Sequence, residues 1–490
     1  MEWTREDRYK GLDSISEEKY TQMVRRVEKS PWRQYYHIQP VTGLLNDPNG
    51  FIYYKGKYHL FYQWFPLGPV HGLKYWYHVS SEDLATFKNE GPVIYPDTLY
   101  DSHGAYSGSS IQIDDKLYVF YTGNHRTKDW KRVPYQVYAQ LNNDFQIIKK
   151  VPFISGPPSG YTEHVRDPKI WKNQDKYYLV VGAQNDNKKG RALIYQSKEL
   201  FEFNLLGEIN TGLNDFGYMW ECPDIFRIED KEVFLFCPQG LEKEGNKYNN
   251  IYQSGYLVGN FNYDTLKISH DGFNELDNGF DFYAPQTTLS ADGDRILIGW
   301  MGLPDTEYPT DQYEWAHCMT LPRILSLENN QLKQRIHPDI FKLRDKGIKE
   351  TFKLRNNSRE WDLIEPGRLE IDFSIKDNSS ERITILLANK VGESIEIDID
   401  FIKNIFQLNR LNSGQLPSNQ DDQRRSVDLG EVFSNMQVFI DNSSIEIFIN
   451  DGSKVMSSRV FPQIPYSQCQ IKVEKGNADL EVNQYKLKEG

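Results

Sequence analysis

Short hydrophobic runs, each introduced by a polar turn, recur through the first 338 positions of the 490-residue chain. Five of them are similar: YYKGKYHLFYQ (53–63), IDDKLYVFYTG (113–123), NQDKYYLVVGAQ (173–184), EDKEVFLFCPQG (229–240) and ADGDRILIGWMG (291–302). A polar turn followed by an alternating or wholly apolar run predicts a β-hairpin. The hairpins recur every 56 to 63 residues. That period is typical of β-propeller blades. The alternative is an array of β-sandwiches whose hairpins resemble one another by chance, but five evenly spaced units argue against it, so we predict five blades.

A second short motif precedes each hairpin turn. The five motifs are NDPNGF (46–51), YSGSSI (106–111), RDPKIW (166–171), ECPDIF (221–226) and YAPQTT (283–288). Four contain a proline, which suits the first residue of a strand, and Asn49-Gly50 also favours a tight turn. In a propeller these motifs begin the innermost strands and face one another around the channel. Three of them contribute a carboxylate, from Asp47, Asp167 and Glu221.

The remaining segments have other patterns. Residues 1–30 are charged and predict a helical extension, with Ser16 as an N-cap. The propeller is expected over 31–338 and a linker over 339–358. Residues 359–490 contain short alternating runs separated by Asn, Asp and Gly, which predict a β-sandwich. The predicted fold class is therefore all-β: a five-bladed β-propeller followed by a C-terminal β-sandwich.

Charge and composition narrow the classes of partner. The formal net charge is −12, which argues against nucleic acid or an anionic membrane surface as a partner. No apolar run approaches the roughly 20 residues of a membrane helix, and the charged N-terminus does not resemble a secretion signal. Four scattered cysteines indicate a reduced compartment. We expect a cytoplasmic protein; the oligomeric state is not indicated.

The three acidic residues are the candidate chemistry. A single acid at a strand end is usually solvated or paired, but three at equivalent positions of a repeat indicate a function. Metal binding is one use, yet the sequence has no Asp-rich calcium loop and no histidine cluster, so we expect no metal and no other cofactor. The other use is glycoside hydrolysis, which needs one carboxylic acid and one carboxylate. We expect Arg166 to keep Asp167 ionised, the surroundings of Glu221 to raise its pKa, and Asp47 to be the nucleophile.

These motifs resemble glycoside hydrolase family 32, the invertases and fructan hydrolases. The similarity covers about residues 30–490 and includes NDPNG, RDP and ECP in that order, with a sandwich signature at 441–462. It implies retaining cleavage of β-fructosides through a fructosyl-enzyme, with Asp47 as nucleophile, Glu221 as acid/base and Asp167 as transition-state stabiliser. The fructose subsite implied by the resemblance comprises Asn46, Gln63, Tyr106, Ser107, Arg166, Tyr283 and Trp300.

The chain departs from the family pattern after Gln63. His71 stands where members often have tryptophan, and Phe65 where asparagine is common. This variant resembles the bacterial intracellular branch that hydrolyses sucrose 6-phosphate, so we expect a sugar substrate, sucrose 6-phosphate or sucrose. His71 and Lys74 are candidates for binding a phosphate. Further candidates lie in a basic loop that can equally be only solvated: Lys128, Lys131 and Arg132.

Three alternatives remain open at this point. A fructan exo-hydrolase of the inulin or levan type would use the same residues. An inverting hydrolase of the arabinanase or xylosidase type also uses three carboxylates, but the NDPNG and sandwich signatures argue against it. A non-catalytic sugar-binding protein would have no need to keep all three acids.

Overall fold

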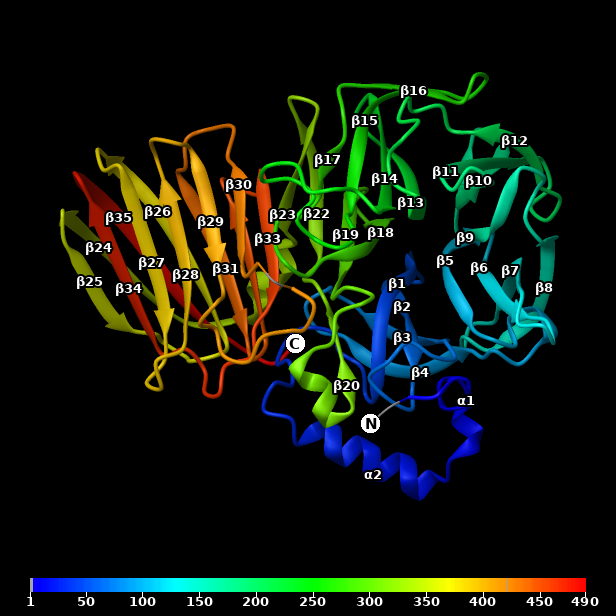
Figure 1. The fold of residues 1–490 in the computed structure, drawn as a ribbon, viewed down its shortest axis with the longest axis horizontal. Helices are drawn as coiled ribbons and strands as arrows, with labels where there is room; N and C mark the ends of the chain where they lie inside the picture. The colour runs from blue at the N-terminus through cyan, green and yellow to red at the C-terminus, as the bar shows by residue number, and fades with distance from the viewer. Residues whose placement is uncertain (1–2, 421) are drawn as a thin grey trace.

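The computed structural model describes residues 3–420 and 422–490, and it confirms the all-β class. Figure 1 shows two parts side by side, five sheets in blue to green and two larger sheets in yellow to red. The five sheets contain four or five strands each and lie between residues 43 and 336. The two larger sheets contain six strands each and lie between residues 344 and 487.

The strands of the five sheets follow the chain. The first sheet contains β20 (Trp315–Ala316), β1 (Gly43–Tyr54), β2 (Lys57–Phe65), β3 (Tyr75–Ser81) and β4 (Lys88–Ile94). The second contains β5 (Ala105–Ile113), β6 (Lys116–Arg126), β7 (Arg132–Leu141) and β8 (Ile147–Ser155). The third contains β9 (Tyr161–Asn173), β10 (Lys176–Asn185), β11 (Gly190–Ser197) and β12 (Asn204–Glu208). The fourth contains β13 (Met219–Ile228), β14 (Lys231–Gln239), β15 (Gly255–Asn262), β16 (Lys267–His270) and β17 (Asn274–Glu275). The fifth contains β18 (Tyr283–Leu289), β19 (Arg295–Met301), β21 (Cys318–Met319), β22 (Arg323–Glu328) and β23 (Gln331–Ile336).

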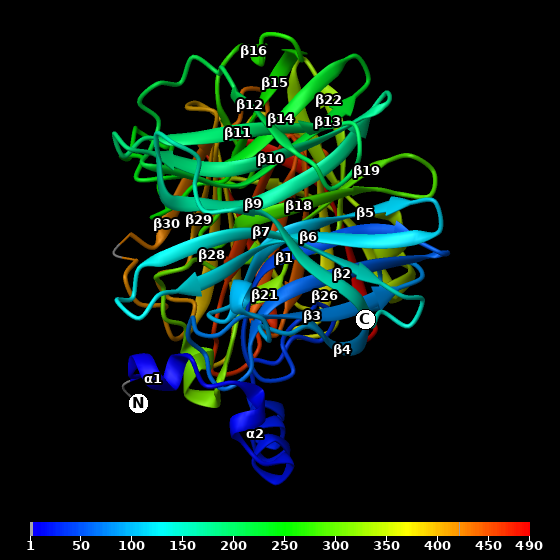
Figure 2. The same cartoon turned by 90° about the vertical axis from the view of Figure 1, so that its right-hand side faces the viewer.

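The first strands of the five sheets are neighbours in space. β1 contacts β5, β5 contacts β9, β9 contacts β13, β13 contacts β18, and β18 contacts β1. Figure 2 views these strands from the side on which the five sheets lie. The short strand β20 leaves the fifth sheet and pairs in parallel with β1, so it also ties the last sheet to the first. Residues that occupy equivalent positions in the five first strands are therefore brought together.

Each first strand contains a β-bulge at its motif. Pairing jumps from Leu45 to Pro48 in β1, so Asn46 and Asp47 together oppose the single residue Gln63. The same two-against-one step occurs at residues 106–107, 167–168, 222–223 and 284–285. A bulge bends the strand and redirects its side chains. The motifs are thus the points at which all five strands bend and redirect their side chains.

The bulges correct two expectations about the motifs. Pro48 and Pro168 do not begin their strands, since β1 starts at Gly43 and β9 at Tyr161. Proline is tolerated there because a bulge interrupts the hydrogen-bonded ladder. Asn49-Gly50 is not a hairpin turn either: it lies inside β1 at a second register shift, and the turn falls at Lys55-Gly56.

The two six-stranded sheets form a β-sandwich around one apolar core, to which both contribute. One sheet contains β24 (Arg344–Arg355), β35 (Asn477–Leu487), β26 (Leu369–Asn378), β31 (Asn435–Asp441), β32 (Ser444–Ile449) and β33 (Lys454–Arg459). The other contains β25 (Ser358–Asp362), β34 (Gln468–Glu474), β27 (Arg382–Ala388), β28 (Ser394–Asp400), β29 (Ile405–Asn409) and β30 (Arg424–Asp428). Residues 339–358 are not a linker: they contain most of the 3₁₀ helix η4 (Pro338–Leu343) and all of β24, which pairs with β35 along most of its length.

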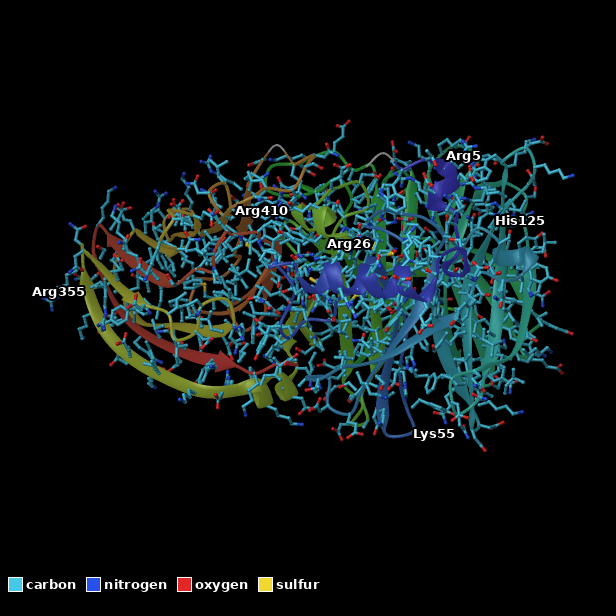
Figure 3. All side chains as sticks on the ribbon, turned by 90° about the horizontal axis from the view of Figure 1, so that it is seen from below. Arg5, Arg26, Lys55, His125, Arg355 and Arg410 are labelled. Atoms are coloured by element: carbon cyan, nitrogen blue, oxygen red, sulfur yellow. The ribbon has the colours of Figure 1, made fainter. Side chains whose placement is uncertain are left out.

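The N-terminal segment is helical, as expected. It contains α1 (Arg5–Arg8), the 3₁₀ turn η1 (Leu12–Ser14) and α2 (Glu17–Glu28), and the side chain of Ser16 caps α2. Figure 3, seen from below, shows these helices facing the viewer, with Arg5 and Arg26 labelled. Within the described residues, no helix combines the length and apolar character needed to cross a bilayer.

Buried charges join the two parts of the molecule. Arg323 of β22 forms ion pairs with Glu446 of β32 at 2.7 Å and with Asp277 at 3.2 Å, and all three side chains are almost fully buried. The imidazole of His37, just before β1, lies between Asp441 at 2.8 Å and Glu446 at 3.0 Å. Burial opposes protonation of His37, but its hydrogen bonds to Asp441 and Glu446 prevail and raise its pKa to about 9.

This network predicts a pH-dependent contribution to stability. A histidine whose folded pKa is raised stabilises fully below its unfolded value, about 6.5, and the contribution is lost as pH rises through about 9. His37→Gln leaves two buried carboxylates with one partner fewer and should cost about 3 kcal/mol at pH 6. Thermal unfolding of both proteins at pH 6, 7.5 and 9 should show the difference shrinking with pH. A constant difference would mean that folding does not raise the pKa of His37.

Candidate active site

A cavity of about 480 Å³ opens where the first strands begin. Its volume falls in the range typical of small-molecule sites. All three acids line it: Asp47 from β1, Asp167 from β9 and Glu221 from β13. Each lies at or directly beside the bulge of its strand, which explains why residues so distant in sequence meet at one depth.

The carboxylate of Asp47 is held by hydrogen-bond donors. Asn46 Nδ2 donates to Oδ1 at 3.0 Å, while Gln63 Nε2 at 3.4 Å and the Ser107 hydroxyl donate to Oδ2. Burial raises the pKa of Asp47, the hydrogen bond from Ser107 partly offsets this, and the charge of Glu221 raises the pKa further. Asp47 is therefore fixed in orientation but is less acidic than expected from the sequence.

Arg166 forms its ion pair with Glu221, whereas the sequence analysis paired it with Asp167. Arg166 donates to Glu221 Oε1 through Nε at 2.8 Å and Nη2 at 2.7 Å. The other oxygen, Oε2, accepts from Tyr283 at 2.6 Å and Gln239 at 2.7 Å. The two contacts from Arg166 are charge-assisted, and the two to Oε2 come from an amide and a hydroxyl. The sequence did not predict this pairing, because it assigned Arg166 to Asp167.

Asp167 is the most deeply placed of the three acids, and only 5% of its surface is exposed. Its Oδ2 accepts the backbone N–H of Cys222 at 3.0 Å. Burial, followed by the charge of Glu221, raises the pKa of Asp167, and the nearby Arg166 only partly opposes this. The expectation that Arg166 keeps Asp167 ionised is therefore wrong, because burial and the second carboxylate outweigh the guanidinium. The Cys222 thiol lies 3.6 Å from Asp47 and 3.7 Å from Asp167, so it separates the two carboxylates.

The predicted binding residues converge on the same cavity. Ser107 reaches it through its hydrogen bond to Asp47, and the others line the wall: Asn46, Gln63, His71, Tyr106, Arg166, Tyr283 and Trp300. The Trp300 indole N–H is buried and has no partner among the described residues. Lys74 and Arg132 line the cavity, whereas Lys128 and Lys131 are exposed in the neighbouring loop and do not.

The cavity also contains residues that the sequence did not single out. They are Arg8, Tyr9, Gly72, Gln239, Tyr252, Pro304 and Asp305. Gln239 could have been predicted from the sequence. It ends β14 after an apolar run, and Gln63 follows a similar run near the end of β2, the equivalent strand of the first sheet. No sequence pattern indicated Arg8 and Tyr9 as site residues, because they lie outside the repeats.

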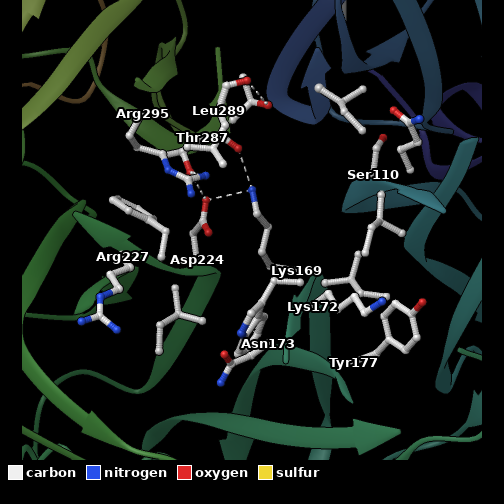
Figure 4. Close-up of a pocket in the computed structure, with 18 of the residues that line it drawn as sticks. Ser110, Lys169, Lys172, Asn173, Tyr177, Asp224, Arg227, Thr287, Leu289 and Arg295 are labelled. Atoms are coloured by element: carbon white, nitrogen blue, oxygen red, sulfur yellow. Dashed lines mark hydrogen bonds and ion pairs between the residues drawn. The ribbon is translucent and has the colours of Figure 1, made fainter. Parts of the chain in front are cut away.

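A larger cavity, about 1040 Å³, lies at the other end of the same strands. Figure 4 shows its centre, where Lys169 Nζ lies 2.9 Å from Asp224 and 2.8 Å from the Thr287 carbonyl oxygen. The Asp224 carboxylate is thus neutralised and also accepts from the Thr287 hydroxyl. Among the described residues that line this cavity, Asp224 is the only fully buried carboxylate, and Lys169 already pairs with it.

Three carboxylates at the floor of a cavity that also offers amide, hydroxyl and indole groups match the needs of glycoside cleavage. The fold and the site together define the protein as a glycoside hydrolase. The family model described as Glycosyl hydrolases family 32 N-terminal domain matches residues 37–337, and that described as Glycosyl hydrolases family 32 C terminal matches residues 339–489. The chain belongs to glycoside hydrolase family 32.

Relatives of known name agree with this family. A sucrose-6-phosphate hydrolase of Staphylococcus xylosus is 45% identical over 489 residues, which is 99% of each chain. One of Bacillus subtilis is 42% identical over 440 residues, covering 88% of this chain and 89% of the other. The structure of a sucrose-6-phosphate hydrolase from Lactobacillus gasseri superposes with a TM-score of 0.91 at 35% identity over the whole of both chains. A Bombyx mori GH32 beta-fructofuranosidase gives 0.83 at 31% identity, covering 97% of this chain and 99% of the other.

The hydrogen bond between Ser107 and Asp47 predicts a shift in pH dependence. Ser107→Ala removes a donor that favours the ionised carboxylate, so the pKa of Asp47 should rise. The acid limb of the kcat/KM profile should move to higher pH by about one unit, the equivalent of one hydrogen bond to a charged group. Ser109→Ala is the matched control, because Ser109 lies on the same strand but bonds only to backbone atoms of β9. An unshifted limb in Ser107→Ala would show that Asp47 does not determine it.

Proposed function

We propose that the protein is a retaining β-fructofuranosidase that hydrolyses sucrose 6-phosphate. The proposal rests on the convergence of Asp47, Asp167 and Glu221 in one cavity of a chain that is 45% identical, along almost its full length, to a sucrose-6-phosphate hydrolase. The Bombyx mori beta-fructofuranosidase, another member of the family, is known in complex with sucrose. A β-fructoside therefore suits this cavity as the substrate class.

We also propose that the five sheets are the blades of one β-propeller, with the cavity at one mouth of its channel. The cyclic order of contacts among β1, β5, β9, β13 and β18 supports this arrangement. The parallel pairing of β20 with β1 supports contact between the fifth and first blades, which would close the ring. A channel of this kind brings one bulge from each blade to the substrate.

In the proposed reaction Asp47 attacks the anomeric carbon of the fructosyl unit while Glu221 protonates the departing glycosidic oxygen. Glu221 then takes a proton from water, whose oxygen displaces Asp47 and releases fructose. The donor contacts around Glu221 suit this second step, in which the residue starts as a carboxylate. In the first step the proton can reside on Oε2, because the hydroxyl of Tyr283 can accept as well as donate.

Asp167 is proposed to bind fructose hydroxyls and to stabilise the positive charge of the oxocarbenium-like transition state. The Cys222 thiol, which lies 3.7 Å from Asp167, also lies 3.6 Å from Asp47, and this nearness supports the proposed role. As positive charge develops on the sugar, an ionised Asp167 becomes more favourable. Its contribution is therefore larger in the transition state than in the free enzyme.

The assigned roles predict severe losses on substitution. Asp47→Asn and Glu221→Gln should each lower kcat by several orders of magnitude, because covalent catalysis needs both groups. The exposed Glu229, in the β13–β14 turn, offers Glu229→Gln as a control that should retain activity. NMR of freshly released fructose should show the β-anomer. An inverted product would exclude Asp47 as nucleophile, and activity surviving both substitutions would exclude the proposed mechanism.

The proposed substrate predicts a preference that one paired assay can measure. The kcat/KM for sucrose 6-phosphate should exceed that for sucrose by at least about tenfold, the equivalent of one charge-assisted hydrogen bond. Purified protein is assayed with both sugars and with an inulin-type oligosaccharide. Equal or better turnover of sucrose would contradict the predicted preference for the phosphorylated sugar. Faster turnover of the oligosaccharide would favour the alternative function, a fructan exo-hydrolase.

A further inference from the structure

The N-terminal extension forms one wall of the catalytic cavity. The carbonyl oxygen of Arg8 accepts the backbone N–H of Leu73 at 2.7 Å, and its guanidinium donates to the carbonyl oxygen of His71 at 3.0 Å. Gly72 permits this approach, since a Cβ there would lie 2.4 Å from the Arg8 oxygen. The extension is therefore fixed to the loop between β2 and β3, which carries His71 and Lys74.

The same segment also contacts the second sheet. The Tyr9 ring packs against His103 and Trp130, with ring centroids 5.4 Å and 5.3 Å apart, and the Arg5 guanidinium lies 4.4 Å from the Trp130 ring centre. Both Arg8 and Tyr9 line the cavity. The extension thus bridges two of the five sheets at the mouth of the site.

The cations on this wall lack acidic partners. In the described residues 3–420 and 422–490, no carboxylate oxygen lies within 4.0 Å of a side-chain nitrogen of Arg8, Lys74 or Arg132. Lys74 is only 3% exposed, and its ammonium group donates to Asn46 Oδ1 at 2.6 Å. Arg166, by contrast, is neutralised by Glu221. Burying cations without counter-charges is costly, so their presence points to an anion supplied by the ligand.

A buried histidine and the buried lysine also line this part of the cavity. His71 Nε2 is buried and has no partner among the described residues. Burial lowers the pKa of His71 well below its usual range, so the imidazole is neutral and has a single N–H, for which the Pro304 carbonyl oxygen competes with a ligand. Burial also lowers the pKa of Lys74 to about 7, and the nearby Arg8 contributes to this after the opposing attraction of Asp47. A bound dianion would favour the protonated lysine.

We propose that Arg8, together with His71 and Lys74, binds the phosphate group of the sugar substrate, so that the N-terminal extension is the specificity element of the active site. The inference rests on the proposed function and deepens it. Arginine suits the role because its planar guanidinium can donate to a phosphate through more than one N–H while another remains on the His71 carbonyl oxygen.

Steady-state kinetics of Arg8→Met with sucrose 6-phosphate and with sucrose test the inference. The methionine keeps an apolar stem while removing the charge, and the backbone hydrogen bond from Leu73 does not depend on the side chain. The KM for sucrose 6-phosphate should rise about 10- to 100-fold, the loss expected for one charge-assisted hydrogen bond, and the KM for sucrose should change far less. Inhibition by glucose 6-phosphate should weaken by a similar factor, while inhibition by glucose should not.

Arg5→Met is the matched control, because Arg5 lies on the same helix but stacks on Trp130 and does not line the cavity. It should leave the ratio of the two kcat/KM values unchanged, and thermal unfolding of both variants reports on folding. Equal losses for the two sugars in Arg8→Met would indicate a purely structural role and overturn the inference, as would no loss. If the wild-type enzyme shows no preference for sucrose 6-phosphate, the proposed substrate itself fails. A preference that survives in Arg8→Met overturns this inference alone.

Discussion

The structure depends on one repeated constraint, a β-bulge at the same depth in each of five neighbouring strands. In regular strands alternate side chains point to opposite faces, so a motif of two or three consecutive polar residues could not face one site. The bulge lets two residues oppose one and redirects them. Asp47, Asp167 and Glu221 are far apart in sequence, but each lies at or beside such a bulge, and the contacts among the first strands bring the bulges together.

Gathering three acids creates an electrostatic cost, which the site meets differently at each position. Glu221 is paired with Arg166, Asp47 accepts from three neutral donors, and burial raises the pKa of Asp167. The unequal surroundings separate the three carboxyl groups chemically although they belong to equivalent positions of a repeat. In the proposed mechanism, such separation lets similar residues serve as nucleophile, acid/base and stabiliser.

The segments outside the five sheets complete the site and the fold. The sandwich contributes no residue to the catalytic cavity among those described, but Glu446 and Asp441 anchor His37 directly before β1. The extension before His37 brings Arg8 and Tyr9 to the cavity mouth. The catalytic floor thus comes from the repeat, and one wall comes from a helix that precedes it. In our proposal, this division separates the chemistry of the three acids from the choice of substrate.

The sequence by itself determined the all-β class, the five hairpins, the sandwich and the three acids, because hydrophobic alternation, turn chemistry and repeat spacing are local properties of the chain. It also identified Gln63 and Ser107 through their motifs. Only the tertiary structure showed that the prolines lie within bulged strands, that β24 replaces the expected linker, and that Arg166 pairs with Glu221. It alone placed Arg8 in the cavity. The physical reason is that bulge register, ion pairing and the docking of a helix depend on which distant residues become neighbours, and no local pattern records that.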